Sequence, residues 1–310
     1  MKKVLVFDVG GTKISHCIIN EKGEILTDVG KINTPKSAGE IYDYLKKITE
    51  QNGNNFDLVA IATAGCVNNE NTKVLGSTPN LPEDYYKLDF STLSKKRVFI
   101  ENDANAAAWA EYRVGTAKDY TDSIVLTLGT GVGGGIITGG KLLKGSQGVA
   151  GEVGSMKISY DNKRKCTCEN YDCWESYASG TGLKITAEEI AQSDECFKSS
   201  IYKDKSPRDV TTYDIIEGIK VNDTYSQKVY DIWMHHIYCG LVSLVNIFNP
   251  ECVILSGGLG DSADCDWLEK KLNDCSVVTP VKVAHSTMQN HTGMIGCAIL
   301  ALEKLGVRAS

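Results

Sequence analysis

Two glycine-rich turns constrain this chain more than any other feature, because each directly follows a run of strand-forming residues. The first turn lies within residues 8–13 and the second, with five glycines, spans residues 129–135. Phosphate oxygens need backbone N–H donors brought close, and glycine allows that approach without a Cβ clash. Two such turns in separate halves of the chain predict two lobes that close on one nucleotide.

Each turn also has a competing interpretation. Gly-Gly after a strand is typical of an ordinary hairpin turn, so the first turn taken alone leaves both interpretations open. The second turn does not fit the G-x-x-x-x-G-K-[ST] pattern of P-loop proteins. Gly129, Gly131 and Gly134 fit G-x-G-x-x-G, but residues 136–138 are typical of a strand, whereas the dinucleotide-binding turn requires a helix there.

A carboxylate, Asp103, stands between the two turns, just after a β-rich run over residues 97–100. On its own, Asp before the Ala-rich helix predicted over residues 104–112 could be a helix N-cap. Together with two phosphate turns, it favours phosphoryl transfer to a hydroxyl group.

Composition narrows the function classes. The chain has 310 residues, 42% hydrophobic and 23% charged, which suits two domains or one large domain. A net charge of −6 gives no basic field for a nucleic-acid partner. No apolar stretch reaches the ~20 residues that span a bilayer, and no signal peptide is expected, so we expect no membrane partner. Eleven cysteines then favour a reducing cytoplasm with free thiols.

The order of predicted elements is similar in the two halves. Each half opens with strand, glycine turn and strand, which indicates an internal repeat of a βββαβα unit. Strands are predicted over residues 4–8, 14–19, 25–31, 58–63, 123–128, 134–137 and 251–255, and helices over residues 38–51, 228–248 and 292–305.

Seven motifs follow one another along the chain. They are Asp8-Val9-Gly10-Gly11-Thr12-Lys13, Glu101-Asn102-Asp103-Ala104-Asn105, Leu128-Gly129-Thr130-Gly131-Val132-Gly133-Gly134, Gly151-Glu152-Val153-Gly154, Cys166-x-Cys168-x4-Cys173-x-Glu175, Ala178-Ser179-Gly180 and Ile254-Leu255-Ser256-Gly257-Gly258. In this order they resemble the ROK family of sugar kinases and repressors, within the actin-like ATPase superfamily. The resemblance runs almost end to end.

The resemblance implies an α/β protein with the two-lobed actin-like ATPase (ribonuclease H-like) fold and a βββαβα repeat in each lobe. The N-terminal lobe would span residues 1–115, completed by a C-terminal helix over 293–310, and the C-terminal lobe would span residues 116–292. The resemblance also implies a homo-oligomer, a dimer or tetramer.

The resemblance also implies roles for individual residues. Asp103 would be the general base that takes the proton from a sugar 6-hydroxyl as it attacks the γ-phosphate of ATP. The sugar would be bound by Gly65, Thr78, Asn80, Asn102, Asp103, Glu152, Ser155 and Glu175. The phosphates and, through water, Mg²⁺ would be held by Asp8, Gly10, Gly11, Thr12, Lys13, Gly129, Thr130 and Gly131, with Gly257 and Gly258 against the adenosine.

The family's zinc motif is altered. The resemblance implies a structural Zn²⁺ held by one His and by Cys166, Cys168 and Cys173, but Ser155 stands where the His is expected. Structural zinc almost always takes four ligands. Water or Asp161 could complete the site, or the loop binds no metal; the sequence leaves both open.

The implied function is an ATP-dependent hexose kinase acting on glucose or an N-acetylhexosamine such as N-acetylmannosamine. The shorter Ser155 could leave room for an N-acetyl group or a β-glycoside, so β-glucoside phosphorylation is an alternative. A second alternative is a non-catalytic sugar-sensing regulator. The family's repressors carry an N-terminal DNA-reading domain, and the first strand is predicted to begin three residues after Met1, so the enzyme branch is favoured.

Overall fold

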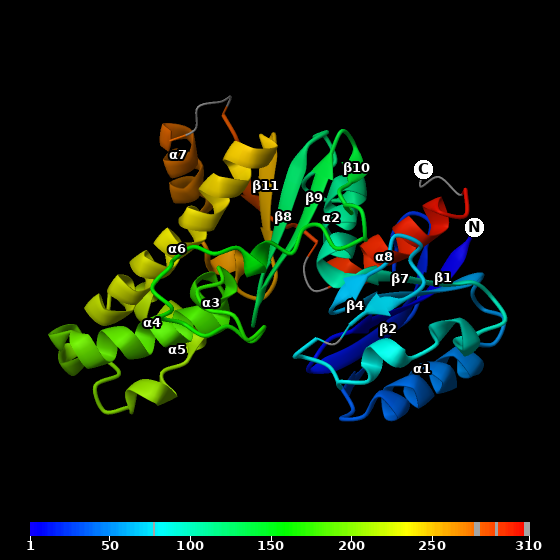
Figure 1. The fold of residues 1–310 in the computed structure, drawn as a ribbon, viewed down its shortest axis with the longest axis horizontal. Helices are drawn as coiled ribbons and strands as arrows, with labels where there is room; N and C mark the ends of the chain where they lie inside the picture. Colours follow the sequence, from blue (N-terminus) through cyan, green and yellow to red (C-terminus); the bar gives the residue numbers. More distant parts are fainter. Residues whose placement is uncertain (77, 276–279, 289–290, 307–310) are drawn as a thin grey trace. The chain divides into compact units, whose positions relative to one another are not determined.

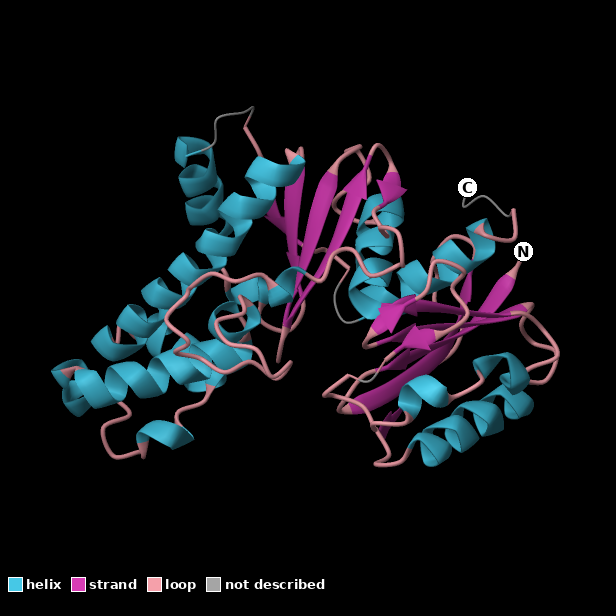
Figure 2. Cartoon of the chain, in the orientation of Figure 1, coloured by secondary structure: helices cyan, strands magenta, loops and turns pink. Residues whose placement is uncertain are grey.

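The computed structural model describes residues 1–76, 78–275, 280–288 and 291–306 (Figures 1 and 2). The chain forms two compact units. Unit 1 comprises Met1–Val125, Gly134–Gly151 and Thr287–Ser310, and unit 2 comprises Leu126–Gly133 and Glu152–Ser286. The predicted lobe boundaries at residues 115 and 292 stay a prediction. Within the described ranges, the chain has no helix with both the length and the apolar character that a bilayer crossing requires.

The first sheet has the strand order β3-β2-β1-β4-β7. β1, β2 and β3 pair antiparallel, and β4 and β7 then add parallel to β1. β1 and β4 read as nearly continuous apolar runs because both faces of the sheet are covered by helices. The bounds are β1 (Lys3–Val9), β2 (Lys13–Asn20), β3 (Gly30–Asn33), β4 (Leu58–Thr63) and β7 (Val98–Asn102).

The third strand is shorter than predicted. The prediction over residues 25–31 is wrong for most of its length, because β3 begins at Gly30 and Ile25 makes only an isolated bridge to Ile19. The hydroxyl of Thr27 accepts the N–H of Ile18 at 3.0 Å. A side chain that takes a ladder donor in this way competes with strand pairing.

The second sheet repeats the first. Its strand order is β10-β9-β8-β11-β12, with β9 and β10 antiparallel and β11 and β12 parallel. The two orders correspond strand for strand, which confirms the predicted βββαβα repeat. The bounds are β8 (Ser123–Leu128), β9 (Val132–Thr138), β10 (Lys141–Leu142), β11 (Cys252–Ser256) and β12 (Lys282–His285). A separate small hairpin pairs β5 (Cys66–Val67) with β6 (Val74–Leu75).

Two helices cover one face of the first sheet. α2 (Asp103–Val114) and α8 (Thr292–Glu303) pack on each other and on β1 and β4, although they are nearly 200 residues apart in sequence (Figure 1). A Cβ at Gly296 would overlap the carbonyl oxygen of Ala106, so the two helix backbones are in direct contact. This contact fixes α2, and with it the start of the helix at Asp103. α1 (Ala38–Asn52) covers the opposite face.

Unit 2 is mainly helical around two buried tryptophans. The indole N–H of Trp233 donates to Ala178 O at 2.8 Å, and that of Trp174 donates to His236 O at 2.8 Å. These bonds fasten α6, which begins at Thr224 and not at the predicted residue 228, to the segment that carries Glu175. The helices are α3 (Glu175–Ala178), α4 (Gly180–Ser193), α5 (Thr212–Lys220), α6 (Thr224–Phe248) and α7 (Cys265–Cys275). Short 3-10 helices in the chain are η1 (Tyr85–Lys87), η2 (Phe90–Leu93), η3 (Val153–Ser155), η4 (Glu195–Ser199), η5 (Pro207–Asp209) and η6 (Gly260–Ser262).

We predict that Gly296→Ala lowers the free energy of unfolding by about 1–3 kcal/mol in urea titrations, because the added methyl group overlaps the Ala106 carbonyl. Gly293→Ala is the matched control in the same helix, where the new Cβ would lie 3.6 Å from the Asp103 carbonyl oxygen, an ordinary contact. The control should be neutral or stabilising, since Ala favours a helix over Gly. Equal losses in both variants would contradict the close α2–α8 contact.

Candidate active site

The first glycine turn connects β1 to β2 as a hairpin. The N–H of Gly10 donates to Lys13 O at 3.1 Å, and Thr34 braces the turn by donating its hydroxyl to Gly10 O at 2.6 Å. The hairpin interpretation is therefore confirmed, while phosphate binding by the same turn stays a prediction. A Cβ at Gly11 would lie 2.6 Å from the carbonyl oxygen of Asn80. Asn80 is thus brought to the turn, and Thr12 and Lys13 are exposed.

Asp8 lies at the end of β1, between Ser15 of β2 and Ala62 of β4. Burial raises the pKa of this carboxyl group to about 6. Burial disfavours the ionised form of this carboxyl group, and a nearby cation would stabilise that form. Carboxylate and water oxygens are also the ligands that Mg²⁺ prefers. The residue type and its environment therefore fit the predicted contact to hydrated Mg²⁺.

The strand-to-helix junction brings three predicted sugar ligands together. Asn102 is the N-cap of α2, where its side-chain oxygen accepts from Asn105 N at 3.0 Å. Its Nδ2 donates to Gly65 O at 3.1 Å. Gly65 has a φ of 96°, and a Cβ there would lie 3.5 Å from Thr78. Gly65, Thr78 and Asn102 thus form one group.

Asp103 is the first residue of α2, and the capping interpretation of this residue is wrong because Asn102 fills that role. One carboxylate oxygen of Asp103 accepts the N–H of Ala104 at 2.9 Å. The N-terminal end of a helix favours negative charge, so the fold supports an ionised carboxylate at this point.

The second glycine turn is held against the start of α4. Gly180 N donates to Gly129 O at 2.8 Å, and the hydroxyl of Thr181 donates to Thr130 O at 3.0 Å. Ser179 caps this helix of 14 residues by accepting from Gly182 N at 3.1 Å. The N-terminus of a helix next to a glycine turn is a favourable place for phosphate.

Glu175 joins the second turn to the cysteine loop. One oxygen accepts the N–H of Val132 at 3.0 Å, and the other accepts from the Thr167 hydroxyl at 3.1 Å. A Cβ at Gly131 would overlap the first oxygen, so position 131 requires glycine. The sequence predicts Glu175 as a sugar ligand but does not indicate this contact to the second glycine turn.

The remaining predicted residues of unit 2 gather near the ends of β8 and β9. A Cβ at Gly154 would overlap Val132 O, and Leu259 N, beyond Gly257 and Gly258, donates to Leu128 O at 2.9 Å. Glu152 and Ser155, at the two ends of the short segment around Gly154, are exposed. The second turn, the Gly151-Glu152-Val153-Gly154 motif and the Gly257-Gly258 turn are therefore neighbours.

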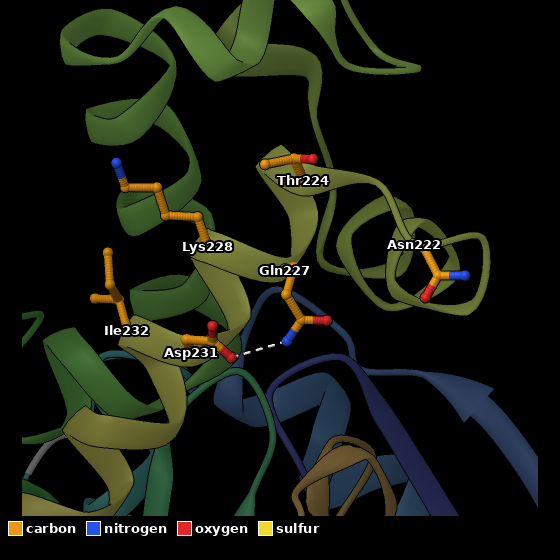
Figure 3. A pocket seen from close by; sticks show the side chains of 6 residues that line it. All are labelled: Asn222, Thr224, Gln227, Lys228, Asp231 and Ile232. Carbon is orange, nitrogen blue, oxygen red and sulfur yellow. Dashed lines mark hydrogen bonds between the residues drawn. The ribbon is translucent and has the colours of Figure 1, made fainter.

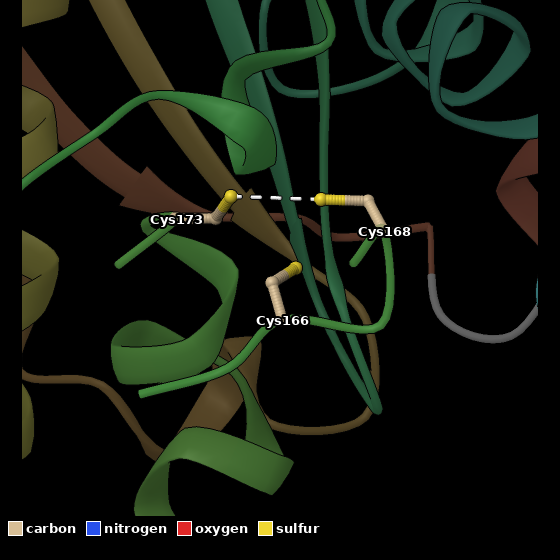
Figure 4. A group of neighbouring side chains, drawn as sticks. All are labelled: Cys166, Cys168 and Cys173. Carbon is tan, nitrogen blue, oxygen red and sulfur yellow. Dashed lines mark hydrogen bonds between the residues drawn. The ribbon is translucent and has the colours of Figure 1, made fainter. Parts of the chain in front are cut away.

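The three cysteines of the altered zinc motif converge (Figure 4). The Sγ atoms of Cys166, Cys168 and Cys173 all lie within 4.8 Å of one another, and those of Cys168 and Cys173 are 3.6 Å apart. Tetrahedral zinc–thiolate bonds of ~2.3 Å imply sulfur separations of about 3.7 Å, so this trio fits three zinc ligands. Asp161 is not part of the group. Burial acts to raise the pKa of Cys168, but hydrogen bonds from Asn170 and the other two cysteines lower it to about 7.

Ser155 lies beside this loop. Met156 O accepts from Trp174 N at 2.6 Å, and Lys157 bridges Cys173 antiparallel. Ser155 directly precedes Met156, so it lies next to the segment that contacts Cys173 and Trp174.

A hollow of about 430 Å³ on unit 2 is separate from the predicted site residues (Figure 3). It lies along the first turns of α6, where Gln227 donates to Asp231 at 2.8 Å. None of the predicted site residues lines it, and we assign no function to it. Its lining residues are Asn222, Thr224, Gln227, Lys228, Asp231 and Ile232.

Comparison with known proteins finds one family and several sugar kinases that resemble this chain. Residues 4–304 match the ROK family. The chain is 33% identical to a glucokinase of Streptomyces coelicolor over 308 residues, 96% of each protein. It is 28% identical to the N-acetylgalactosamine kinase AgaK of Shewanella, over 82% of this chain and 81% of that protein. Among solved structures, the ROK family glucokinase of Streptomyces griseus in complex with glucose and AMPPNP is 31% identical with a TM-score of 0.82, covering 96% of this chain and 98% of that one.

Asp8→Asn tests the partly buried carboxylate at the end of β1. Because burial raises the pKa of Asp8 to about 6, the folded state binds more protons than the unfolded state between about pH 4 and 6, and the wild type loses stability as pH rises through that window. In Mg²⁺-free buffer, the free energy of unfolding of the variant should rise relative to that of the wild type by on the order of 2 kcal/mol between pH 4 and pH 7. Urea unfolding at both pH values measures this, with the exposed Asp28→Asn as the control for the substitution itself. A pH-independent difference would refute the assignment.

Ser155→His tests the metal site. The new imidazole would supply the fourth ligand, so zinc content should rise from below one per chain in the wild type toward one in the variant, as measured by atomic emission on purified protein. Ser159→His, on the same segment, should leave the zinc content unchanged. A full zinc complement in the wild type would show that the cysteines already have a fourth partner.

Proposed function

Because this chain belongs to the ROK family, we propose that it is an ATP-dependent sugar kinase that transfers the γ-phosphate to the 6-hydroxyl of a hexose. The observation that carries the proposal is the junction at Asn102 and Asp103. Asn102 caps α2 and reaches Gly65, and the Asp103 carboxylate follows directly, at the positive end of the helix.

In the proposed reaction, Asp103 accepts the proton of the 6-hydroxyl as that oxygen attacks the γ-phosphate. The loose transition state of phosphoryl transfer requires alignment more than strong basicity, so an Asp suffices. Gly65, Thr78 and Asn102, together with Asn80, Glu152, Ser155 and Glu175, are proposed to bind the sugar. Carboxylates such as Glu152 accept hydrogen bonds from ring hydroxyls.

The nucleotide is assigned to the two glycine turns. In unit 1, Asp8 would hold hydrated Mg²⁺ while the N–H groups of Gly10, Gly11 and Thr12, with Lys13, face phosphate oxygens. In unit 2, Gly129–Gly131 would bind phosphate with the help of the α4 N-terminus, and Gly257 and Gly258 would contact the adenosine. Mg²⁺ supplies charge neutralisation on the phosphates when bound.

We propose glucose or an N-acetylhexosamine as the acceptor. The glucokinase relatives support the first, and the relative that acts on N-acetylgalactosamine supports an acetylated sugar. Ser155, shorter than the family's His, favours tolerance at C1 or C2, which keeps β-glucosides as an alternative. A regulator without activity is disfavoured because Asp103 and both glycine turns are intact.

An ATP-consumption assay over a panel of sugars is the direct test. Glucose, N-acetylmannosamine, N-acetylgalactosamine and a β-glucoside form the panel, and the sugar with the highest kcat/KM identifies the acceptor. Absence of sugar-dependent ATP turnover, in protein that still binds a sugar, would favour the regulator.

Asp103→Asn should lower kcat by several orders of magnitude while the Kd values of sugar and ATP change little, since the amide keeps the shape but cannot take the proton. Stopped-time turnover and calorimetric titration on the same preparation measure the two effects. Asp89→Asn, a cap at a 3-10 helix, serves as a control for Asp substitution. Near-normal turnover in Asp103→Asn would show that another group is the base.

A further inference from the structure

Glu101, immediately before Asn102 and Asp103, lies at the centre of a buried polar network. Its side chain is fully buried on β7. Oε2 accepts from Lys144 Nζ at 2.8 Å and from Asn71 Nδ2 at 2.7 Å. Oε1 accepts from the Asn102 N–H at 2.9 Å and from Asn105 Nδ2 at 3.4 Å. A buried carboxylate is costly unless it is paired and hydrogen-bonded, and here both conditions are met.

The donors come from segments far apart in the sequence. Asn71 lies between β5 and β6, with a φ of 60°. It also holds β7 through two hydrogen bonds with Ile100: the Ile100 N–H donates to Asn71 O at 2.9 Å, and Asn71 Nδ2 donates to Ile100 O at 2.8 Å. Lys144 follows β10. The Glu101 carboxylate therefore ties two distant loops to the turn from β7 into α2, where Asn102 and Asp103 are presented.

Lys144 supplies the charge that this carboxylate needs. Among the described residues it is the cation paired with Glu101, and its own side chain is only 15% exposed. Removing the ammonium group would leave Glu101 buried without a counter-charge. An uncompensated buried charge is strongly unfavourable, so the carboxylate would move toward water, and this movement weakens the acceptor for the Asn102 N–H.

We propose that Glu101 and Lys144 are positioning residues for phosphoryl transfer. They do not contact the substrate; they fix the backbone at Asn102 so that the Asn102 side chain and the Asp103 carboxylate start from one defined geometry. This inference rests on the proposed function, because the residue that is positioned is the proposed base.

The structure also predicts which substitution preserves the network. A cavity of about 310 Å³ adjoins the pair and is lined in part by Asn71, Trp109 and Lys141. It offers room for a guanidinium group, so Lys144→Arg can keep the ion pair with Glu101, whereas Lys144→Met removes it. Lys141→Met is the matched control, because Lys141 is an exposed lysine of the neighbouring strand β10, outside the network.

Steady-state kinetics with the best sugar of the panel test the proposal. Lys144→Met should lose about 10²-fold in kcat with a nearly unchanged KM for ATP, because a small displacement of the base affects the transition state more than nucleotide binding. Lys144→Arg should recover most of the wild-type kcat, and Lys141→Met should keep it. Wild-type kcat in Lys144→Met would overturn the proposal.

Two further measurements keep the result interpretable. Hydrogen exchange should speed up at the amides of residues 102–105 in Lys144→Met but not across the rest of the first sheet; a uniform increase would indicate general destabilisation and would overturn positioning. If Lys144→Met does not fold, Glu101→Gln combined with Lys144→Met removes both charges and should fold with a kcat well below that of the wild type; full activity would overturn positioning. A wild type that phosphorylates no sugar overturns the proposed function itself, whereas an active wild type with a fully active Lys144→Met overturns the positioning role alone.

Discussion

The junction from β7 into α2 is the constraint on which the rest of unit 1 depends. One asparagine, Asn102, caps the helix and reaches Gly65 in the same geometry. The helix itself is fixed because α8 packs against it so closely that Gly296 has no room for a side chain. Strand, cap and helix packing together decide where the Asp103 carboxylate begins, so the proposed chemistry is a consequence of how the core is assembled.

In unit 2, a helix N-terminus and a side-chain hydrogen bond likewise fix a functional segment, here the second glycine turn and Glu175. This turn is backed by the N-terminus of α4, and Glu175 takes the Val132 N–H directly after the turn. Because Glu175 also accepts from Thr167, the turn is mechanically linked to the loop of three cysteines. A metal bound by those cysteines would stabilise the position of Glu175 and, through it, the second glycine turn.

The sequence allowed much of this arrangement to be predicted, where local chemistry dominates. Apolar runs followed by glycine turns indicated β1, β2, β8 and β9, and the repeat of that pattern predicted the matching sheets. The rest could not be predicted, because contacts between residues distant in sequence override local preferences. Residues 25–29 have strand-like composition, yet the Thr27 hydroxyl takes a ladder donor. The ion pair of Glu101 with Lys144 joins residues 43 positions apart. In the sequence, the charged Glu101 at the end of an apolar strand indicates that it needs a partner but does not indicate which residue provides it. The substrate-binding and catalytic assignments remain predictions.

The central claim is that this chain moves the γ-phosphate of ATP to a hexose 6-hydroxyl. Phosphorus-31 and proton NMR of a reaction containing the protein, Mg²⁺, ATP and the best sugar of the panel, repeated with the 6-deoxy analogue of that sugar, tests it most directly. The account predicts ADP and a sugar phosphate whose phosphorus couples to the protons on C6, with no product from the 6-deoxy sugar. Phosphate transfer to another carbon, or equal turnover of the 6-deoxy analogue, would contradict it.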